Sequence, residues 1–403
     1  MVYLNLICFL IIYLILFLLE MKFWKSIATP FILTTAPIVF LLVFNQTVGV
    51  LMGFFNINNI LFYIYFLFGF LSIFFASFFV RILASSQDFN FLKKNKFKNN
   101  VLQIKYASYL FKILLFIKIS QILYLYITGT SFLNMKGLLG SGISGISTLL
   151  MIFCFVFFYG AYEKLKINNF VLMLLSILPL FLYGTRGWMF IAIIGAIMFK
   201  GYYHGKWPSK LFLLISPILG ISFMMITYLF RNAVGEVDSN FYDIFQHVMG
   251  YFLAGIQGAN QLFGSSVPTT PYLGMSFSAL INLKEFLIGN KEYVSNIGPA
   301  FFYINKINVN LSNVNTAFGT LYHGLGPIFA TIYIYILYFI LYFIFMVKYK
   351  IKNIFILMFY SVVMSGIFLS FFEYYLGLIF YFFATCFILC AYLLINYLIS
   401  LRK

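Results

Sequence analysis

Residues 3–19 read YLNLICFLIIYLILFLL, an apolar run close to the length that spans a bilayer. No basic segment precedes this run and no small-residue cleavage site follows it, so we expect a membrane span and not a cleaved signal peptide. Similar runs recur along the whole chain, and their apolar residues are continuous instead of alternating with polar ones. Continuous runs of this kind indicate helices and exclude a β-barrel.

The composition points to the same class of protein. Hydrophobic residues make up 63% of the 403 residues and charged residues 9%, against about 25% charged residues in a typical soluble domain. We therefore predict an all-α, polytopic transmembrane helical bundle of about eleven spans. The expected spans lie near residues 3–19, 26–44, 60–80, 108–128, 143–162, 167–184, 188–203, 211–230, 325–346, 354–371 and 379–399.

The basic residues predict the orientation of the chain in the membrane. The formal net charge is +17, and a Lys-rich stretch over residues 81–105 follows the third expected span. If this stretch is cytoplasmic, eighteen Lys and Arg residues lie on the cytoplasmic side and six outside, while Lys112 and Lys118 fall inside a span. This bias predicts an extracytoplasmic N-terminus and a cytoplasmic C-terminus. It accounts for the charge without a nucleic-acid partner.

One connection is much longer than the others. It divides the chain into a membrane bundle over residues 1–230, an extracytoplasmic loop over residues 231–324 and a second membrane segment over residues 325–403. Because a structureless loop of that length is unusual, we expect it to contain folded elements. Residues 240–263 have helical periodicity, and residues 277–289 are typical of a second short amphipathic helix.

The helix expected over residues 240–263 has two different faces. Its apolar face carries Phe241, Phe245, Val248 and Phe252. Its polar face carries Asp243, His247, Gln257 and Gln261 at helical spacing. Such a helix is expected to lie along the membrane surface with the polar side chains toward water.

Two arginines stand at the predicted outer ends of spans, where the topology does not require positive charge. Arg186 lies in LFLYGTRGWMFIAII (180–194), between two apolar runs and with glycines close by on both sides. A guanidinium at this place suits an anion such as phosphate, and the glycines let a ligand approach the backbone. A turn whose arginine reaches the membrane interface is the alternative. Arg231, in LFRNAVGEVD (229–238), repeats the placement.

Three residues are candidates for acid–base chemistry. His323, in GTLYHGLG (319–326), can take a proton from a hydroxyl near neutral pH. Glu236 and Asp238 have the acid-x-acid spacing of some metal-dependent transferases, although a solvated turn is the simpler interpretation. The four cysteines lie in apolar runs without neighbouring His or acidic residues, so we expect no metal and no other cofactor.

These features together resemble the Wzy-type polymerases of O-antigen and capsular polysaccharide, which join oligosaccharide repeat units. The resemblance covers most of the chain in topology and rests on two short motifs. The first is a Gly-Ser/Thr-Arg-Gly turn, and the second is a polar stretch before a span. The matching residues are Gly184, Thr185, Arg186 and Gly187 in the first motif, and Asn315, Thr316, Tyr322, Gly324 and Gly326 in the second. Relatives often carry an acidic residue beside the last glycine, where this chain has Gly324 and Leu325, so the identity of the general base stays open.

The resemblance implies a GT-C-like fold and a glycosyltransferase of the bacterial plasma (inner) membrane. This enzyme would move a growing glycan from undecaprenyl diphosphate onto a lipid-linked oligosaccharide repeat unit at the outer face. Arg186 and Arg231 would then stabilise the departing diphosphate, and His323, Glu236 or Asp238 would act as the general base. The expected substrate-binding residues are Asp243, His247, Gln257, Asn315, Thr316 and Tyr322.

Two other functions stay open at this point. An O-antigen ligase uses the same donor, but the His-Asn-x-x-Leu element typical of ligases does not occur at residues 314–318, which read VNTAF. A flippase or transporter of lipid-linked oligosaccharide would need polar groups along a path at mid-depth, where Lys118 stands almost alone. The implied partners are undecaprenyl-diphosphate-linked oligosaccharides and the lipid bilayer, with a chain-length regulator and a flippase as further proteins.

Overall fold

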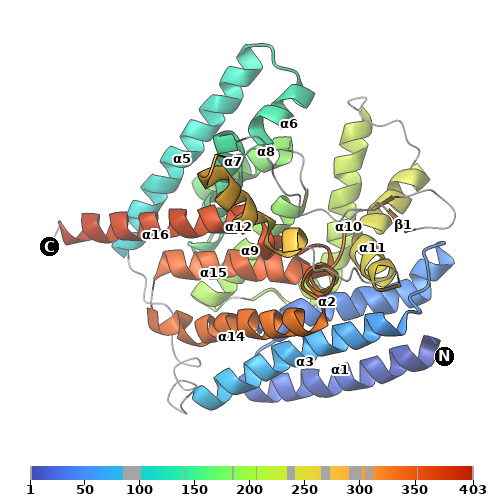
Figure 1. The fold of residues 1–403 in the computed structure, drawn as a ribbon. Helices are drawn as coiled ribbons and strands as arrows, with labels where there is room; N and C mark the ends of the chain where they lie inside the picture. The colour runs from blue at the N-terminus through green and yellow to red at the C-terminus, as the bar shows by residue number, and fades with distance from the viewer. Residues whose placement is uncertain are drawn as a thin grey trace. The chain divides into compact units, whose positions relative to one another are not determined.

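The computed structural model describes residues 2–84, 101–140, 142–183, 186–205, 207–233, 241–264, 273–289, 302–304, 311–312, 314–351 and 353–401. Nearly all of these residues are helical (Figure 1). The α-helices are α1 (Val2–Trp24), α2 (Pro30–Phe44), α3 (Ile60–Leu83), α5 (Val101–Ile127), α6 (Phe132–Gly140), α7 (Gly142–Gly160), α8 (Ile167–Tyr183), α9 (Arg186–His204), α10 (Lys210–Ala233), α11 (Phe241–Gly264), α12 (Leu273–Leu287), α13 (Ala317–Leu325), α14 (Pro327–Ile351), α15 (Ile354–Phe368) and α16 (Ile379–Ser400). Short turns of other helix types are η1 (Asn45–Gly49), η2 (Leu369–Phe371) and η3 (Tyr375–Gly377), and β1 (Phe302–Tyr303) pairs antiparallel with β2 (Leu311–Ser312).

The predicted class of helical membrane protein is confirmed. Within the described residues, eight helices are long and apolar enough to cross a membrane, and each overlaps an expected span. These are Tyr3–Trp24, Pro30–Gly49, Ile60–Leu83, Val101–Ile127, Ile143–Gly160, Pro327–Val347, Ile354–Phe371 and Phe383–Ser400. The apolar segments Ile167–Tyr183 and Ile218–Leu229 are shorter. The full number of spans and the side of the membrane on which each terminus lies stay predictions.

Two short helices, α6 and α13, were not expected from the sequence pattern. Met135 and Leu139 of α6 are buried against Ile122 of α5. α13 is separated from α14 by Gly326, whose φ is +75°, and Pro327 begins α14 immediately afterwards. Glycine adopts a positive φ at low cost and proline does not continue a preceding helix, so the chain turns here instead of entering the span as one helix.

The chain folds as two compact units, each built from segments that are far apart in the sequence. The first unit consists of Met1–Ser85, Lys210–Phe345 and Ile367–Leu378, and the second of Ser86–Ser209, Met346–Gly366 and Ile379–Lys403. The boundaries expected from the sequence, at residues 230 and 324, mark the two ends of the long predicted loop. The boundaries of the two units follow the packing of the helices.

A buried carboxyl group joins three helices of the first unit. Glu20 of α1 is 0% exposed and accepts hydrogen bonds from the hydroxyl of Ser77 on α3, at 2.6 Å, and from the hydroxyl of Tyr342 on α14. Each hydroxyl oxygen accepts a further bond, the first from the indole Nε1 of Trp24 at 2.7 Å and the second from the backbone N–H of Phe31 at 2.9 Å. Figure 1 shows α1 and α3 running side by side in this unit. The network therefore holds α1, α3, α14 and the start of α2 together.

The second unit is organised around α7. This helix packs against α5, α8 and α9. A Cβ atom added at Gly160 of α7 would lie 2.5 Å from the ring of Phe199 on α9, so the two helices approach closely at this glycine. Small residues allow such an approach between helices in a membrane, where van der Waals contact is a main source of helix association.

Tyr342→Phe is expected to destabilise the first unit by about 1–3 kcal/mol, because it leaves a buried carboxylate oxygen and a first-turn N–H without a partner. The measurement is the free energy of unfolding in detergent, followed by circular dichroism. Tyr335→Phe on the same helix is the matched control, since the Tyr335 hydroxyl has no hydrogen bond among the described residues. Equal stability of the two variants would contradict the prediction.

Candidate functional site

The short helix α13 is placed in the first unit by a polar N-terminal cap. The hydroxyl of Thr316 accepts a hydrogen bond from the N–H of Gly319 at 3.0 Å, which satisfies one of the free donors at the start of the helix. The N–H of Thr316 itself donates to the carbonyl of Gly255 on α11 at 3.2 Å. Every residue of α13 is buried. Thr316, which the sequence suggested as a substrate-binding residue, therefore has a structural role as the cap.

α11 and α13 run parallel at close range. Besides the bond from Thr316 to Gly255, a Cβ atom added at Gly319 would lie 3.0 Å from the Cβ and 3.3 Å from the Cα of Ala259. From the first contact to the second, the chain advances from Gly255 to Ala259 on α11 and from Thr316 to Gly319 at the start of α13. Each step is about one helical turn, so the two helices run in the same direction. His323 follows Gly319 by one further turn on the same side of α13, so it continues along the line of contact with α11.

Besides Oε1 of Gln257, four polar side-chain atoms on α11, η2 and α13 with its cap are buried without a hydrogen-bond partner. These atoms are Oδ1 of Asn315, Nδ1 of His323, Oδ1 of Asn260 on α11 and Oγ of Ser370 on η2. η2 belongs here because the carbonyl oxygen of Phe371 lies so close to Gly255 that it leaves no room for a Cβ atom at this position. We call Asn260, Asn315, His323 and Ser370 the polar seam. A buried polar atom without a partner costs about 1–3 kcal/mol, so a ligand or an ordered water that supplied hydrogen bonds here would stabilise the folded protein.

The chemistry of His323 follows from its burial. The side chain is 7% exposed, and burial lowers the pKa of the imidazole below its usual value of 6.5. The ring is therefore neutral at neutral pH, with one nitrogen able to accept a hydrogen bond or a proton. His323 lies in α13, directly before α14, and its role in catalysis stays a prediction.

Glu373 is a second titratable group in the same unit. It lies between η2 and η3, in a segment held by a hydrogen bond of 2.6 Å between the hydroxyls of Tyr374 and Tyr333 and by the close approach of Gly377 to the carbonyl oxygen of Ser276 on α12. Burial raises the pKa of the Glu373 carboxyl from 4.5 to about 7. Such a group can exchange a proton near neutral pH. The signal in the sequence was a single acid between two apolar runs, in SFFEYYLG (370–377).

The predicted orientation of α11 is wrong for its C-terminal half. Gln257 is fully buried, and its Nε2 donates to Oδ1 of Asn45 at 2.8 Å and to the carbonyl of Phe55 at 2.6 Å. Gln261 donates to the carbonyl of Tyr303. The reason is that α11 packs against α2, α3 and α13 instead of lying alone on a membrane surface. The amide nitrogens of Gln257 and Gln261 therefore bond to neighbouring groups of the protein, while Oε1 of Gln257 has no partner.

Two residues of the first turns of α11 remain accessible. Asp243 and His247 are exposed, as predicted. The imidazole of His247 meets the rings of Tyr228 on α10 and Tyr251 on α11 edge-on, at centroid distances of 4.8 and 5.3 Å. Tyr251 in turn stacks on Phe372 at 5.8 Å. This aromatic group offers ring faces beside the segment that carries Glu373.

Tyr322 is engaged within the protein. Its hydroxyl shares a hydrogen bond of 3.2 Å with the hydroxyl of Thr331, and its ring stacks on Tyr65 at a centroid distance of 5.1 Å. Both contacts are internal to the first unit. The structure thus gives Tyr322 a packing role, and a role in substrate binding stays a prediction.

The remaining predicted residues are not part of the polar seam. Arg186 is the first residue of α9, half-buried, in the second unit. Arg231 lies in the last turn of α10, and its side chain is outside what the structure describes. Glu236 and Asp238 lie outside the described residues. Within the described part of the chain, no three His, Cys, Asp or Glu side chains come together as metal ligands.

Glu373→Gln is expected to change how stability depends on pH. Because the pKa of this carboxyl rises from 4.5 to about 7 on folding, the folded state holds the proton more tightly than the unfolded state. The resulting stabilisation is present below pH 4.5 and is lost as the pH rises through about 7. Thermal unfolding in detergent should show the variant equal to the wild type near pH 4.5 and more stable by about 1–3 kcal/mol at pH 8.

Glu285→Gln controls for the loss of one carboxylate, since Glu285 pairs with Lys284 at 3.7 Å elsewhere in the first unit. The difference in stability between Glu373→Gln and the wild type should grow between these two pH values. A constant difference across the range would contradict the assignment.

Comparison with known proteins places the chain in a family. No curated protein and no solved structure matches it. A family model matches residues 49–402, which is most of the chain, and its description is "Family of unknown function (DUF6337)". The match includes α3 to α16, and with them the polar seam, Glu373 and Arg186. The chain therefore belongs to the DUF6337 family, a family of unknown function.

Proposed function

We propose that the protein is a polysaccharide polymerase. In this proposal it is a glycosyltransferase that moves a growing glycan from undecaprenyl diphosphate onto a lipid-linked oligosaccharide repeat unit at the outer face of the plasma membrane. The polar seam is the observation that supports the proposal most, because its unpartnered atoms are the amide oxygens of Asn260 and Asn315, a ring nitrogen of His323 and the hydroxyl of Ser370. Sugar hydroxyls are donors, so a glycan supplies the partners that these atoms lack.

The proposed reaction needs a base for the acceptor hydroxyl and a cation for the departing diphosphate. The acceptor hydroxyl attacks the anomeric carbon of the donor, and the bond between that carbon and the diphosphate oxygen breaks. The hydroxyl proton goes to a base, for which His323 and Glu373 are the candidates, with Glu236 and Asp238 as the alternatives from the sequence. The bonding electrons leave with the diphosphate, and a guanidinium stabilises the charge that develops there. Arg186 and Arg231 are the candidates for this second role.

His323→Gln is expected to lower the rate of polymerisation by about 10²-fold or more, the usual effect of removing a general base. The assay uses purified protein in liposomes with undecaprenyl-diphosphate-linked repeat units, and gel electrophoresis resolves the products by length. His204→Gln is the matched control, because His204 is a histidine of the second unit whose Nε2 is also buried without a partner. A full-length ladder from the His323→Gln protein would remove this histidine from the mechanism.

In cells, loss of the protein should leave surface glycan with a single repeat unit, and the wild-type protein should restore the ladder. Arg186→Ala should fail to restore it, and Arg186→Lys should restore it poorly, because lysine lacks the bidentate geometry of guanidinium toward phosphate. Glycan with no repeat unit attached would indicate a ligase instead. Repeat units retained on the inner leaflet would indicate a flippase.

A further inference from the structure

The second unit contains a buried lysine within a membrane-spanning helix. Lys118 lies in α5 and is 1% exposed. Its ammonium donates to Oε1 of Gln121 at 2.9 Å, to the carbonyl and hydroxyl oxygens of Ser144 at 3.0 and 3.2 Å, and to the hydroxyl of Ser147 at 3.1 Å. Ser144 and Ser147 belong to the first turns of α7. We call Lys118, Gln121, Ser144 and Ser147 the α5–α7 cluster.

The positive charge of this cluster has no acidic partner nearby. All the acceptors of the Lys118 ammonium are neutral oxygens. The sequence contains no Asp or Glu from residue 89 to residue 162, a stretch that includes the whole of α5, α6 and α7. The next acid, Glu163, follows the opposite end of α7, about 20 Å beyond Ser147 by the rise of a helix. A charge within the bilayer is costly without a counter-charge, so the counter-charge must come from outside these helices.

Two hydrogen atoms of the cluster find no acceptor within it. The hydroxyl oxygen of Ser144 accepts from Lys118 and from Nε2 of Gln121 at 3.0 Å, and the hydroxyl of Ser147 donates to the Ser144 carbonyl at 2.8 Å. The hydroxyl hydrogen of Ser144 and the second amide hydrogen of Gln121 find no acceptor within the cluster. Gln121, Ser144 and Ser147 are half-buried, so a ligand can reach them while Lys118 lies beneath.

The surface around the cluster is apolar. Ile117, Tyr124 and Ile143 are 60%, 66% and 86% exposed, and all three lie within seven residues of a cluster member along α5 or α7. Exposed apolar side chains on a membrane-spanning helix contact lipid chains. A ligand of the cluster must therefore combine an anionic, acceptor-rich head with an apolar tail.

The cluster lies at the same end of the second unit as Arg186. Ile122, one helical turn from Lys118, forms a buried group with Leu139 of α6, and Leu182 near the end of α8 packs against this group. Arg186 begins α9 shortly after Leu182. Two basic residues thus stand at one end of a unit whose three helices α5, α6 and α7 carry no acid.

We propose that the α5–α7 cluster binds the phosphate group of a membrane lipid and that this phosphate is the counter-charge of Lys118. A phosphate supplies both the negative charge and the acceptor oxygens that the cluster lacks. A phospholipid headgroup and a polyprenyl phosphate or diphosphate carrier share this chemistry. The proposal concerns binding alone and does not rest on the proposed polymerase activity.

The test measures lipid binding to the purified full-length protein by native mass spectrometry in detergent. The probes are phosphatidylglycerol, undecaprenyl diphosphate, inorganic phosphate and diacylglycerol, which lacks the phosphate. We expect at least one phosphate-bearing lipid to bind about tenfold or more tightly than diacylglycerol, since charge-assisted hydrogen bonds contribute on this scale. A preference for undecaprenyl diphosphate identifies a carrier site, and a preference for phosphatidylglycerol identifies a phospholipid site.

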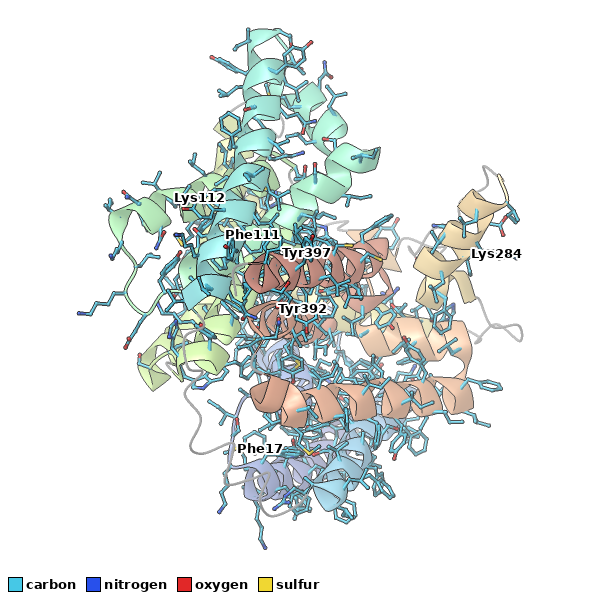
Figure 2. The ribbon with its side chains drawn as sticks, turned by 90° about the vertical axis from the view of Figure 1, so that its left-hand side faces the viewer. Phe17, Phe111, Lys112, Lys284, Tyr392 and Tyr397 are labelled. Atoms are coloured by element: carbon cyan, nitrogen blue, oxygen red, sulfur yellow. The ribbon has the colours of Figure 1, made fainter. Side chains whose placement is uncertain are left out.

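Three variants connect the binding to the cluster. Lys118→Met should abolish the preference for phosphate, and Lys118→Gln should do so while a neutral amide keeps hydrogen bonds to α7. Lys112→Met is the matched control, because Lys112 is exposed on the same helix while its neighbour Phe111 is buried (Figure 2).

Three results would overturn the proposal. One is equal binding of phosphate-bearing lipids and diacylglycerol by the wild-type protein, a result that needs no variant. The second is binding of inorganic phosphate alone, without any of the lipids. The third is an unchanged preference in a folded Lys118→Gln protein, with folding judged by gel filtration.

Discussion

A carboxyl group that is removed from water must find its hydrogen bonds inside the protein, and Glu20 meets this requirement in the first unit. Trp24 donates a hydrogen bond to Ser77, which donates to Glu20. On the other side of the carboxyl group, the backbone N–H of Phe31 donates to Tyr342, which donates to Glu20. Because lipid tails are as apolar as leucine side chains, burial of apolar surface alone does not select which helices of a membrane protein associate. A polar network of this kind selects them, since a wrongly paired helix would leave the carboxylate unsatisfied. The arrangement of α1, α2, α3 and α14 around the rest of the unit depends on it.

The polar seam differs from this network because its atoms are not satisfied. Asn315 and His323 are carried by α13 and its cap, and α11 approaches this segment closely at Gly255 and Ala259. Close packing of backbones together with unpaired acceptors is costly for folding alone. A ligand that completed these hydrogen bonds would offset this cost. Glu373, which burial keeps protonated up to about pH 7, adds a proton-exchanging group to the same unit.

The second unit contains a buried charge whose hydrogen-bond acceptors are all neutral. Lys118 is enclosed by neutral oxygens that stabilise the ammonium locally without cancelling its charge. Hydrogen bonds compensate for the loss of water around an ion, whereas the long-range cost of a net charge in a low-dielectric medium remains. A bound anion removes that remaining cost. Arg186 begins α9 shortly after Leu182, which packs against the buried group that contains Ile122.

The sequence by itself determined the features that depend on local composition and periodicity. Apolar runs of spanning length set the helices of the bundle, and the segments over residues 240–263 and 277–289 fall largely within α11 and α12, as their patterns predict. Tertiary structure alone decided which way α11 faces, because Gln257 and Gln261 bond to groups that are distant in the chain. It also decided that Thr316 is a cap, that Lys118 is enclosed by α7 and that Glu373 is a titratable group near neutral pH. Burial and hydrogen-bond partners are properties of packing between remote segments, and a periodic pattern shows which face of a helix is polar but not what that face meets.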